Sequence, residues 1–368
     1  MTRRTGPVGI GLIGAGVISS TYLDNLTRFP DARVVAIGDL FPAAAERQAS
    51  AYGVPVFGDV RTALDHPDVE LVVNLTIPAA HAEVAAAAIA AGKHVWNEKP
   101  LALDRTSARA LLDQADAAGL RVGCAPDTIL GEGLQTARRL VERGDLGTPL
   151  TALMLMQSPG PDAWHPNPGF LFGTGAGPLF DMGPYYLTAL MQTFGPVAAV
   201  AALGSKARER RVVGSGPRAG EEFDVLVPSH VGTLLQFESG QSAQGIFSFD
   251  SALPRTALEI NGTEATMLLP DPNTFGGSIS VCRRGSRDWE TATTTTERSS
   301  RGTGVLDLAR AIREPRAHRA HGELAYHVLD TMLAVAESAE SGAFTPVAST
   351  AEIPALLPDD WDAFAATL

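Results

Sequence analysis

The chain has 368 residues, of which 41 are acidic and 29 basic, so its formal net charge is −12 at pH 7. This excess of acids disfavours nonspecific nucleic-acid binding, and no apolar run approaches the roughly 20 residues of a membrane span. Cys124 and Cys282 lie far apart and suggest neither a disulfide framework nor a metal site. We therefore expect a cytoplasmic protein without a metal, and a chain of this length predicts two domains.

The first apolar run, Val8–Ile13, opens into a glycine turn, Gly14-Ala15-Gly16-Val17-Ile18-Ser19. Gly14 permits a tight turn, and Gly16 lets the backbone approach a pyrophosphate, which backbone amides and the positive end of a following helix would hold. Ser19 stands where the G-x-G-x-x-G pattern has its third glycine. The pattern predicts a dinucleotide site, and its candidate cofactor contacts are Gly14, Gly16, Val17 and Ile18.

An acidic residue, Asp39, ends the second apolar run, 23 residues beyond Gly16. A carboxylate at this point accepts both ribose hydroxyls of an adenosine and repels a 2′-phosphate, and neither Leu40 nor Phe41 supplies a cation. The sequence therefore favours NAD over NADP as cofactor. The alternative is an ordinary strand–helix turn in which Asp39 caps the helix after Pro42.

Up to Cys124, short β-branched runs alternate with amphipathic stretches, which is typical of a parallel sheet covered by helices. The predicted strands are Val8–Ile13, Arg33–Ile37, Leu71–Leu75, His94–Trp96 and Arg121–Cys124. The predicted helices are Ile18–Arg28, Ala43–Tyr52, His81–Ala91, Thr106–Ala118 and, beyond this region, Gly133–Arg143. The first domain, 1–125, is thus expected to be a doubly wound α/β domain.

Beyond about residue 150, strands follow one another without helices between them, which predicts an α+β domain with a large open antiparallel sheet. Its predicted strands are Leu150–Gln157, Val197–Leu203, Val231–Phe237, Ser242–Phe249, Ala257–Ile260, Ala265–Leu269 and Ile279–Cys282. A late helix, roughly His321–Ser341, is expected to pack back on the first domain. The second domain is placed at 126–368 and is expected to carry the substrate-binding and oligomerisation surfaces.

Ligands of doubly wound folds bind at the carboxyl ends of the strands. Thr76, Pro78 and His81 follow the predicted strand Leu71–Leu75 at this edge and are candidate cofactor contacts, although His81 also suits a helix cap or a packed position. The next strand ends in Glu98-Lys99-Pro100. Glu98 and Lys99 are further candidate contacts, and Lys99–Pro100 is a candidate cis peptide.

These motifs, above all Glu98-Lys99-Pro100, resemble the Gfo/Idh/MocA family of oxidoreductases, and the resemblance extends to Asp181-Met182-Gly183-Pro184-Tyr185. It implies a Rossmann domain, an open-sheet domain, and NAD(P)-dependent hydride transfer between nicotinamide and a secondary alcohol or ketone of a sugar or cyclic polyol. Many relatives have histidine, and some tyrosine, at the position of Tyr185.

Hydride removal from an alcohol requires a group that takes the hydroxyl proton. A phenol beside an ammonium and a desolvated amine can each do so, so the choice between Tyr185 and Lys99 stays open. Asp181 would orient the lysine or bind a substrate hydroxyl; its alternative role is a favourable charge at a helix start. The catalytic candidates are Lys99, Tyr185 and Asp181.

The same three residues are candidate substrate contacts, together with Asp127, Trp164 and His165; Trp164 offers a flat apolar face to a sugar ring. Two other functions stay open: redox-assisted, NAD-dependent glycoside cleavage, and non-catalytic sensing of NAD or a sugar. Because large apolar surfaces are rarely left bare, the open sheet is expected to form a homodimer or homotetramer.

Overall fold

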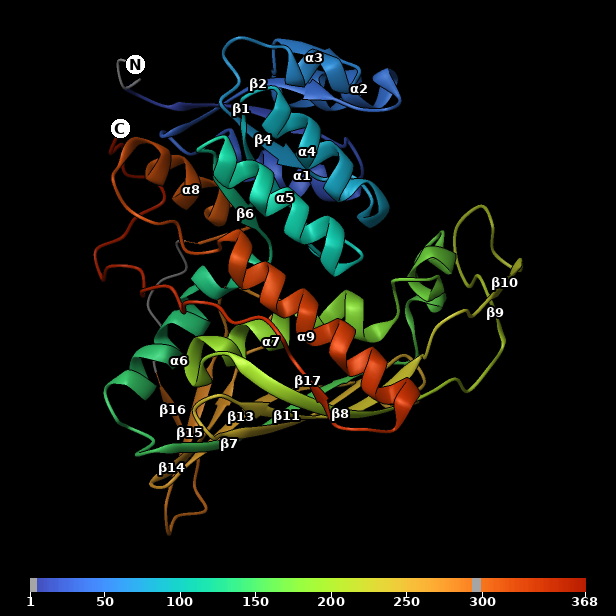
Figure 1. The fold of residues 1–368 in the computed structure, drawn as a ribbon, viewed down its shortest axis with the longest axis vertical. Helices are drawn as coiled ribbons and strands as arrows, with labels where there is room; N and C mark the ends of the chain where they lie inside the picture. Colours follow the sequence, from blue (N-terminus) through green and yellow to red (C-terminus); the bar gives the residue numbers. More distant parts are fainter. Residues whose placement is uncertain (1–4, 293–298) are drawn as a thin grey trace. The chain divides into compact units, whose positions relative to one another are not determined.

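The computed structural model describes residues 5–292 and 299–368, and the chain forms two compact units (Figure 1). Unit 1 comprises Met1–Gly131, Glu297–Tyr326 and Pro354–Leu368, and unit 2 comprises Glu132–Thr296 and His327–Ile353. This division differs from the sequence-based one, because three segments of the stretch 126–368 belong to unit 1. The contacts that hold these segments are described below.

Unit 1 is built on a six-stranded parallel sheet with the order β3-β2-β1-β4-β5-β6, which is that of a Rossmann fold. Its strands are β1 (Val8–Ile13), β2 (Ala32–Gly38), β3 (Val56–Gly58), β4 (Leu71–Asn74), β5 (His94–Asn97) and β6 (Val122–Cys124). Every residue of β1 and β4 is buried, as expected for central strands with helices on both faces. The order reverses between β1 and β4, and this is the point where such sheets bind ligands.

The helices between these strands are α1 (Val17–Leu26), α2 (Pro42–Tyr52), α3 (Val60–Leu64), α4 (His81–Ala90) and α5 (Arg105–Ala117), with short 3-10 turns η1 (Pro78–Ala80) and η2 (Asp127–Leu130). The predicted helices and strands of this region are confirmed, with ends that differ by at most two residues. Sequence analysis missed β3 and α3, which have three and five residues and show no readable periodicity.

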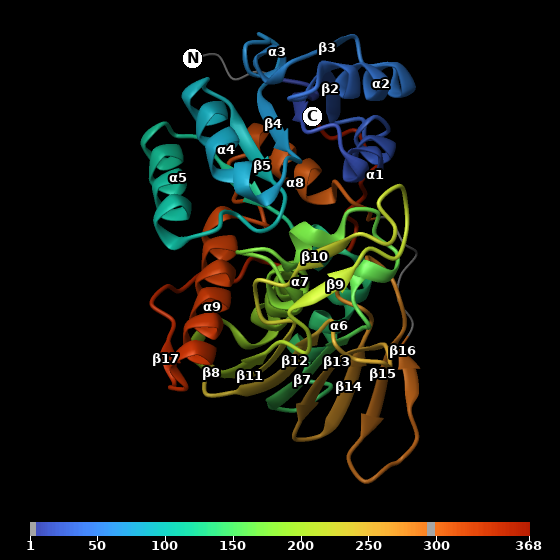
Figure 2. The same cartoon turned by 90° about the vertical axis from the view of Figure 1, so that its right-hand side faces the viewer.

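The helix α8 (Thr303–Arg313) packs on unit 1, although the sequence-based division placed it in the second domain. The backbone of Gly304 approaches Trp96 so closely that a Cβ there would lie 2.1 Å from the indole ring. The side-chain amide of Asn25 in α1 donates to the carbonyl of Arg301 at 2.9 Å, and Figure 2 shows α8 beside α1. Helix α8 therefore covers β5 and β6 on the side of the sheet that carries α1.

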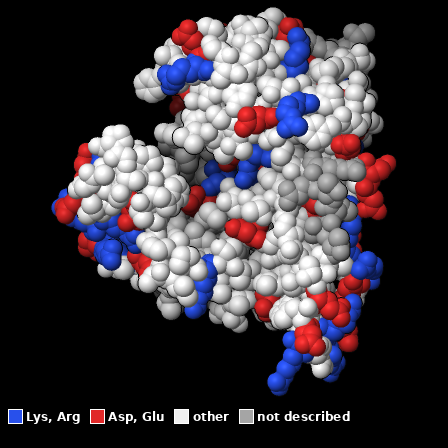
Figure 3. Space-filling model, turned by 180° about the vertical axis from the view of Figure 1, so that it is seen from behind, with Lys and Arg blue, Asp and Glu red and all other residues white. Residues whose placement is uncertain are grey.

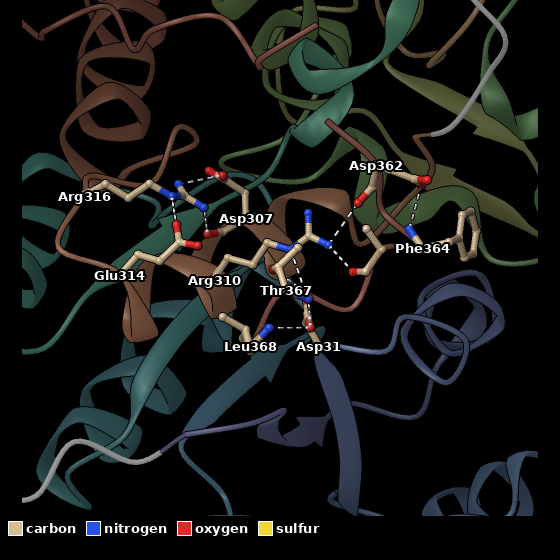
Figure 4. Close-up of polar contacts among 10 residues, drawn as sticks. Asp31, Asp307, Arg310, Glu314, Arg316, Asp362, Phe364, Thr367 and Leu368 are labelled. Carbon is tan, nitrogen blue, oxygen red and sulfur yellow. Dashed lines mark hydrogen bonds and ion pairs between the residues drawn. The ribbon is translucent and has the colours of Figure 1, made fainter. Parts of the chain in front are cut away.

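The last residues of the chain also return to unit 1, where they surround a buried ion pair (Figure 4). Arg310 donates to Asp31 at 2.8 Å and to the carbonyls of Asp362 and Ala365 at 2.9 and 2.8 Å. Asp31 also accepts from the backbone of Thr367 at 2.9 Å. Burial alone raises the pKa of Asp31, but hydrogen bonds from Thr367 and Arg310 outweigh it and hold the pKa below its usual value. These contacts join the C-terminal segments to the Rossmann sheet.

Unit 2 contains a nine-stranded sheet in the order β16-β15-β14-β13-β7-β12-β11-β8-β17. Its strands are β7 (Pro149–Gln157), β8 (Val197–Ser205), β11 (His230–Phe237), β12 (Ser242–Ser248), β13 (Arg255–Gly262), β14 (Ala265–Leu269), β15 (Ile279–Arg283), β16 (Glu290–Ala292) and β17 (Thr345–Pro346). A separate hairpin pairs β9 (Arg210–Val212) with β10 (Glu222–Asp224).

The expected antiparallel pattern holds at every neighbouring pair of this sheet except one, because β7 and β12 are parallel. The exception follows from the order of the strands. β7 is inserted between β12 and β13, which run in opposite directions, so it must be parallel to one of them. The sheet is therefore mixed, though mostly antiparallel.

Helices α7 (Pro178–Phe194) and α9 (Gly322–Ser341) lie along one face of this sheet, and α6 (Glu132–Glu142) packs near β14. Figures 1 and 2 show no helix of the described residues on the other face. The late helix was expected on the first domain, but only Gly322–Tyr326 of α9 belongs to unit 1, and the rest belongs to unit 2. Two 3-10 turns, η3 (Pro161–Ala163) and η4 (Pro168–Phe172), precede α7.

The described residues include no helix with the length and apolar character that a bilayer span requires, and no group of three or more His, Cys, Asp or Glu side chains placed to hold a metal ion. Cys124 and Cys282 are free thiols, the first buried and the second half-buried. Acidic and basic side chains are interspersed over the face drawn in Figure 3.

Candidate functional site

The turn between β1 and α1 is built around two glycines with different requirements. Gly14 has a φ of 102°, and a Cβ there would lie 2.6 Å from the backbone of Leu75. Only glycine fits, so the turn lies directly against the end of β4. Gly16 instead has an ordinary φ of −77°. Apart from its chain neighbours, no described atom lies within 4 Å of the position that a Cβ on Gly16 would take. The space beside Gly16 is therefore open.

The start of α1 faces this open space. Within the described residues, no side chain caps the helix at Gly16 and its first turn contains no acid. Val17 is 96% exposed and Ile18 is 36% exposed, although both are apolar. Uncapped amides and the positive end of the helix dipole favour an anion here. The arrangement fits the pyrophosphate of a dinucleotide.

Asp39, at the end of β2, lies against the same turn. Its Oδ2 accepts from the amide of Ala15 at 2.6 Å, and its Oδ1 accepts from the amide of Phe41 at 2.8 Å. The N-cap of α2 is Phe41, so the alternative role of Asp39 as the N-cap residue of this helix does not hold. The half-buried carboxylate instead puts a negative charge beside the glycine turn, where a ribose with free hydroxyls fits better than a 2′-phosphate.

Two buried asparagines, which sequence analysis did not single out as site residues, hold the ends of β4 and β5. Asn74 and Asn97 face each other in register, and Asn74 Nδ2 donates to Asn97 Oδ1 at 2.7 Å. Thr76 Oγ1 donates to Asn74 Oδ1 at 2.7 Å, which fixes the loop after β4. Asn97 Nδ2 donates to the carbonyl of Leu101 at 3.1 Å. The sequence signal that could have identified Asn74 and Asn97 is that each is the polar last residue of one of two adjacent parallel strands.

His81 is almost fully buried between two loops of this edge. Its Nδ1 lies 2.7 Å from the carbonyl of Pro100, and its Nε2 lies 3.0 Å from the carbonyl of Thr76. Burial lowers the pKa of His81. Both ring nitrogens face backbone carbonyls, so the imidazole links the loop after β4, which includes half-buried Pro78, to the turn after β5.

The turn after β5 contains the cis peptide Lys99–Pro100 that the sequence predicted. Lys99 is half-buried at the carboxyl edge of the sheet. Glu98 turns towards α1: its Oε1 accepts from the hydroxyl of Tyr22 at 2.7 Å, and its Oε2 accepts from the amide of Lys99 at 3.0 Å. Sequence analysis did not identify Tyr22.

Asp127, expected to line the substrate site, is fully buried at the start of α8. It accepts from the amides of Gly302 and Gly304 at 2.8 and 3.2 Å and pairs with Arg301 at 3.1 Å. Burial raises the pKa of Asp127. The carboxylate thus satisfies the free amides of a helix N-terminus within unit 1.

In unit 2, Asp181 and Tyr185 lie one turn apart on α7 and leave the helix on the same side. Asp181 is in the first turn, where the helix dipole favours a carboxylate, and Gly177 is the N-cap residue. Tyr185 is buried. The adjacent Tyr186 points to the sheet, where its hydroxyl donates to the carbonyl of Leu155 at 3.1 Å. The two tyrosines therefore occupy different sides of α7.

Trp164 and His165 belong to an exposed aromatic cluster of unit 2. The ring of His165 lies 5.6 Å from that of Trp164 and 5.4 Å from that of Phe170, both in edge contacts. Trp164 is 66% exposed and Phe170 is 51% exposed. His165 Nδ1 accepts from the amide of Asn167 at 3.0 Å, so a neutral ring carries its proton on Nε2. The cluster offers flat apolar surfaces and one fixed donor.

The strand order, the glycine turn and Asp39 define unit 1 as a dinucleotide-binding domain with a Rossmann fold. Residues 8–125 match the family described as "Oxidoreductase family, NAD-binding Rossmann fold", and residues 134–268 match the "GFO/IDH/MocA C-terminal domain". Together the two matches span most of the chain. The chain belongs to the Gfo/Idh/MocA oxidoreductase family, which confirms the resemblance found in the sequence.

Individual relatives match part of the chain in sequence and nearly all of it in fold. Inositol 2-dehydrogenase from Burkholderia lata is 32% identical over 145 residues, which are 38% of this chain and 43% of the relative, so the match spans less than half the relative's length. An NAD binding oxidoreductase from Klebsiella pneumoniae has a TM-score of 0.81 at 24% identity, covering 94% of this chain and 100% of that one. Levoglucosan dehydrogenase, in complex with NADH and L-sorbose, has a TM-score of 0.81 at 22% identity, covering 93% and 99%. At these identities the solved structures show a shared fold.

Proposed function

We propose that the protein is an NAD-dependent oxidoreductase that transfers hydride between nicotinamide and a secondary alcohol or ketone of a sugar or cyclic polyol. The observation that carries the proposal is the glycine turn of unit 1, where the Asp39 carboxylate accepts from the Ala15 amide beside the uncapped start of α1. The substrate class is supported by relatives named inositol 2-dehydrogenase and levoglucosan dehydrogenase.

The binding residues have distinct tasks in this proposal. The first amides of α1 hold the pyrophosphate, and Asp39 accepts the ribose hydroxyls. Thr76 and Pro78 line the nicotinamide half. His81 acts by holding the loops of Thr76 and Pro100, and Asp127 acts by fixing the start of α8, because the polar atoms of both side chains already bond the protein's own backbone.

Bound NAD supplies the hydride acceptor. As the C–H bond of the alcohol breaks, the Lys99/Tyr185 pair takes the hydroxyl proton, so that the oxidised product leaves as a neutral ketone. Asp181 orients the amine or accepts a second substrate hydroxyl. Trp164 packs against the apolar face of the ring, and His165 donates to a hydroxyl.

The test measures NAD binding by calorimetry and NADH formation with a panel of inositols, aldoses and anhydrosugars. Substrate-dependent NADH formation that falls at least about a hundredfold in Lys99→Ala or Tyr185→Phe, with NAD still bound, supports the proposal. Tyr186→Phe is the matched control for the second variant. Tight NAD binding without turnover would instead favour a sensor, and glycoside cleavage without net NADH would favour the redox-assisted class.

A further inference from the structure

Helix α1 and the turn that carries Lys99 are joined by a buried polar chain of three side chains. The indole nitrogen of Trp96 lies 3.2 Å from the hydroxyl oxygen of Tyr22, and that hydroxyl lies 2.7 Å from Glu98 Oε1. Trp96 and Tyr22 are fully buried, and Glu98 is half-buried. These three hydrogen-bonded side chains thus connect α1 to β5 and to the turn after it.

The direction of each hydrogen bond is fixed by chemistry. An indole N–H is only a donor, so Tyr22 accepts from Trp96 and must direct its own proton to Glu98. Burial, together with the nearby Glu98 and Asp127, raises the pKa of Tyr22 well above its usual value. The hydroxyl therefore remains a donor over the whole working pH range.

Both oxygens of Glu98 are used. Oε1 accepts from Tyr22, and Oε2 accepts from the amide of Lys99 at 3.0 Å. A carboxylate whose two oxygens both accept hydrogen bonds keeps one orientation. The Glu98 carboxylate thereby fixes the orientation of the Glu98–Lys99 peptide group, whose N–H it accepts from. On its other side this turn is held by His81, which contacts the carbonyl of Pro100.

We propose that Tyr22 is a positioning residue for Lys99. Tyr22 bonds Glu98, and Glu98 bonds the backbone of Lys99, so the position of α1 fixes the turn that carries the lysine. The first amides of α1 face the proposed pyrophosphate site. The proposal rests on the proposed function, because it assigns Lys99 a role beside the nicotinamide. It gives Glu98, the first residue of the Glu98-Lys99-Pro100 signature, a task within the protein, because both of its carboxylate oxygens accept from the protein's own groups.

The test compares Tyr22→Phe with Tyr52→Phe. Tyr52 is a matched control because its hydroxyl, like that of Tyr22, bonds a carboxylate. This carboxylate is Asp24 of α1, at 2.8 Å, and the hydroxyl also lies 3.2 Å from the carbonyl of Ser20 on the same helix. In Tyr22→Phe we expect kcat to fall about tenfold with the NAD dissociation constant within about twofold of wild type, since misplacing a reacting group mainly affects the chemical step. Tyr52→Phe should leave both unchanged.

A second readout does not depend on turnover. The lysines of the chain are Lys93, Lys99 and Lys206, so competitive acetylation by acetic anhydride, followed by mass spectrometry, reports Lys99 against an internal reference. We expect the Lys99/Lys206 labelling ratio to change about threefold in Tyr22→Phe and not in Tyr52→Phe, because amine reactivity follows its local environment. If wild type oxidises no member of the substrate panel, the proposed function fails while this ratio still decides the role of Tyr22.

Glu98→Gln is the second variant. In glutamine one of the two terminal atoms is an NH2 group that only donates, so either Tyr22 or the Lys99 amide loses the acceptor it has on Glu98. The variant should therefore change the same ratio even if Tyr22→Phe does not fold. A folded Tyr22→Phe with wild-type kcat and labelling ratio overturns the proposal. An unchanged Lys99/Lys206 labelling ratio in Glu98→Gln also overturns it. A Tyr22→Phe variant that differs from wild type only in a lower melting temperature overturns it as well.

Discussion

The amide of Ala15 donates to the carboxylate of Asp39 at 2.6 Å, which joins the turn after β1 to the end of β2. This contact places a negative charge at the turn that faces the proposed ribose site. Asp39→Asn keeps an acceptor oxygen but removes the charge, so we expect the preference for NAD over NADP to fall about tenfold, or about 1.4 kcal/mol. Calorimetric titration of both nucleotides measures the ratio. Asp59→Asn, at the N-cap of α3, is the control and should leave the ratio unchanged.

The two glycines of the turn predict opposite effects of an added methyl group. Gly16→Ala has an allowed φ and open space, so stability should change by less than about 0.5 kcal/mol while NAD binding weakens at least about tenfold. Gly14 has a φ of 102°, and a Cβ there would lie 2.6 Å from the backbone of Leu75. Gly14→Ala should therefore lower the free energy of unfolding by more than about 2 kcal/mol. Chemical denaturation and NAD titration separate the two. Equal destabilisation by both variants would contradict this account.

The Asp31–Arg310 pair predicts how strongly the C-terminal segments are attached. The side chains of Arg310 and Asp31 are 5% and 1% exposed. Arg310→Met leaves a buried carboxylate without its cation, so we expect a loss of about 3 to 5 kcal/mol in the free energy of unfolding, measured by chemical denaturation. The exposed pair Arg61–Asp65 has a similar distance of 2.7 Å, and Arg61→Met should cost less than about 1 kcal/mol.

Two histidines, His318 buried and His94 half-buried, predict a loss of stability in weak acid. Burial lowers the pKa of His94 and of His318 to about 4 each. Their unfolded values are near 6.5, so between about pH 4 and 6.5 the unfolded chain binds more protons than the folded one. Stability should therefore fall as pH drops through this window. Melting temperatures of wild type and His94→Gln at about pH 7 and 5 test this, and the variant should lose less on acidification. Parallel losses would show that other groups dominate.

The open face of the nine-stranded sheet predicts self-association. Leu203, Leu234 and Leu268 point to this face and are 75%, 49% and 36% exposed. We expect a homodimer or homotetramer by light scattering, and the double variant Leu234→Lys, Leu268→Lys should shift it towards monomer because buried unpaired lysines are costly at an interface. Arg47→Glu, at an exposed position of α2 in unit 1, is a control substitution. A monomeric wild type would contradict this prediction.

Much of unit 1 could be predicted from sequence because its signals are local. β1, α1 and β2 are marked by apolar runs, a glycine turn and an acid at a fixed distance, and the structure has them there. Helix α8 could not be assigned to unit 1 in this way. Its partners are Trp96, Asp127 and Asp31, and nothing in its own residues says which sheet it covers.

The candidate site shows the same limit at the level of side chains. Sequence placed His81 and Glu98 at the carboxyl edge of the sheet, but not the direction in which they point. His81 faces two carbonyls, and Glu98 faces Tyr22, which lies six residues beyond Gly16 in the middle of α1. Such orientations depend on residues far apart in the chain.

The division of unit 1 into three separate stretches of chain has a consequence for biosynthesis. A ribosome would release strands β7 to β16 of unit 2 before it released α8 and the segment that surrounds Arg310. Unit 1, although its sheet strands precede those of unit 2, would then complete its packing only after β7 to β16 had emerged. Until α8 emerged, the indole of Trp96 would lack the cover that Gly304 gives it.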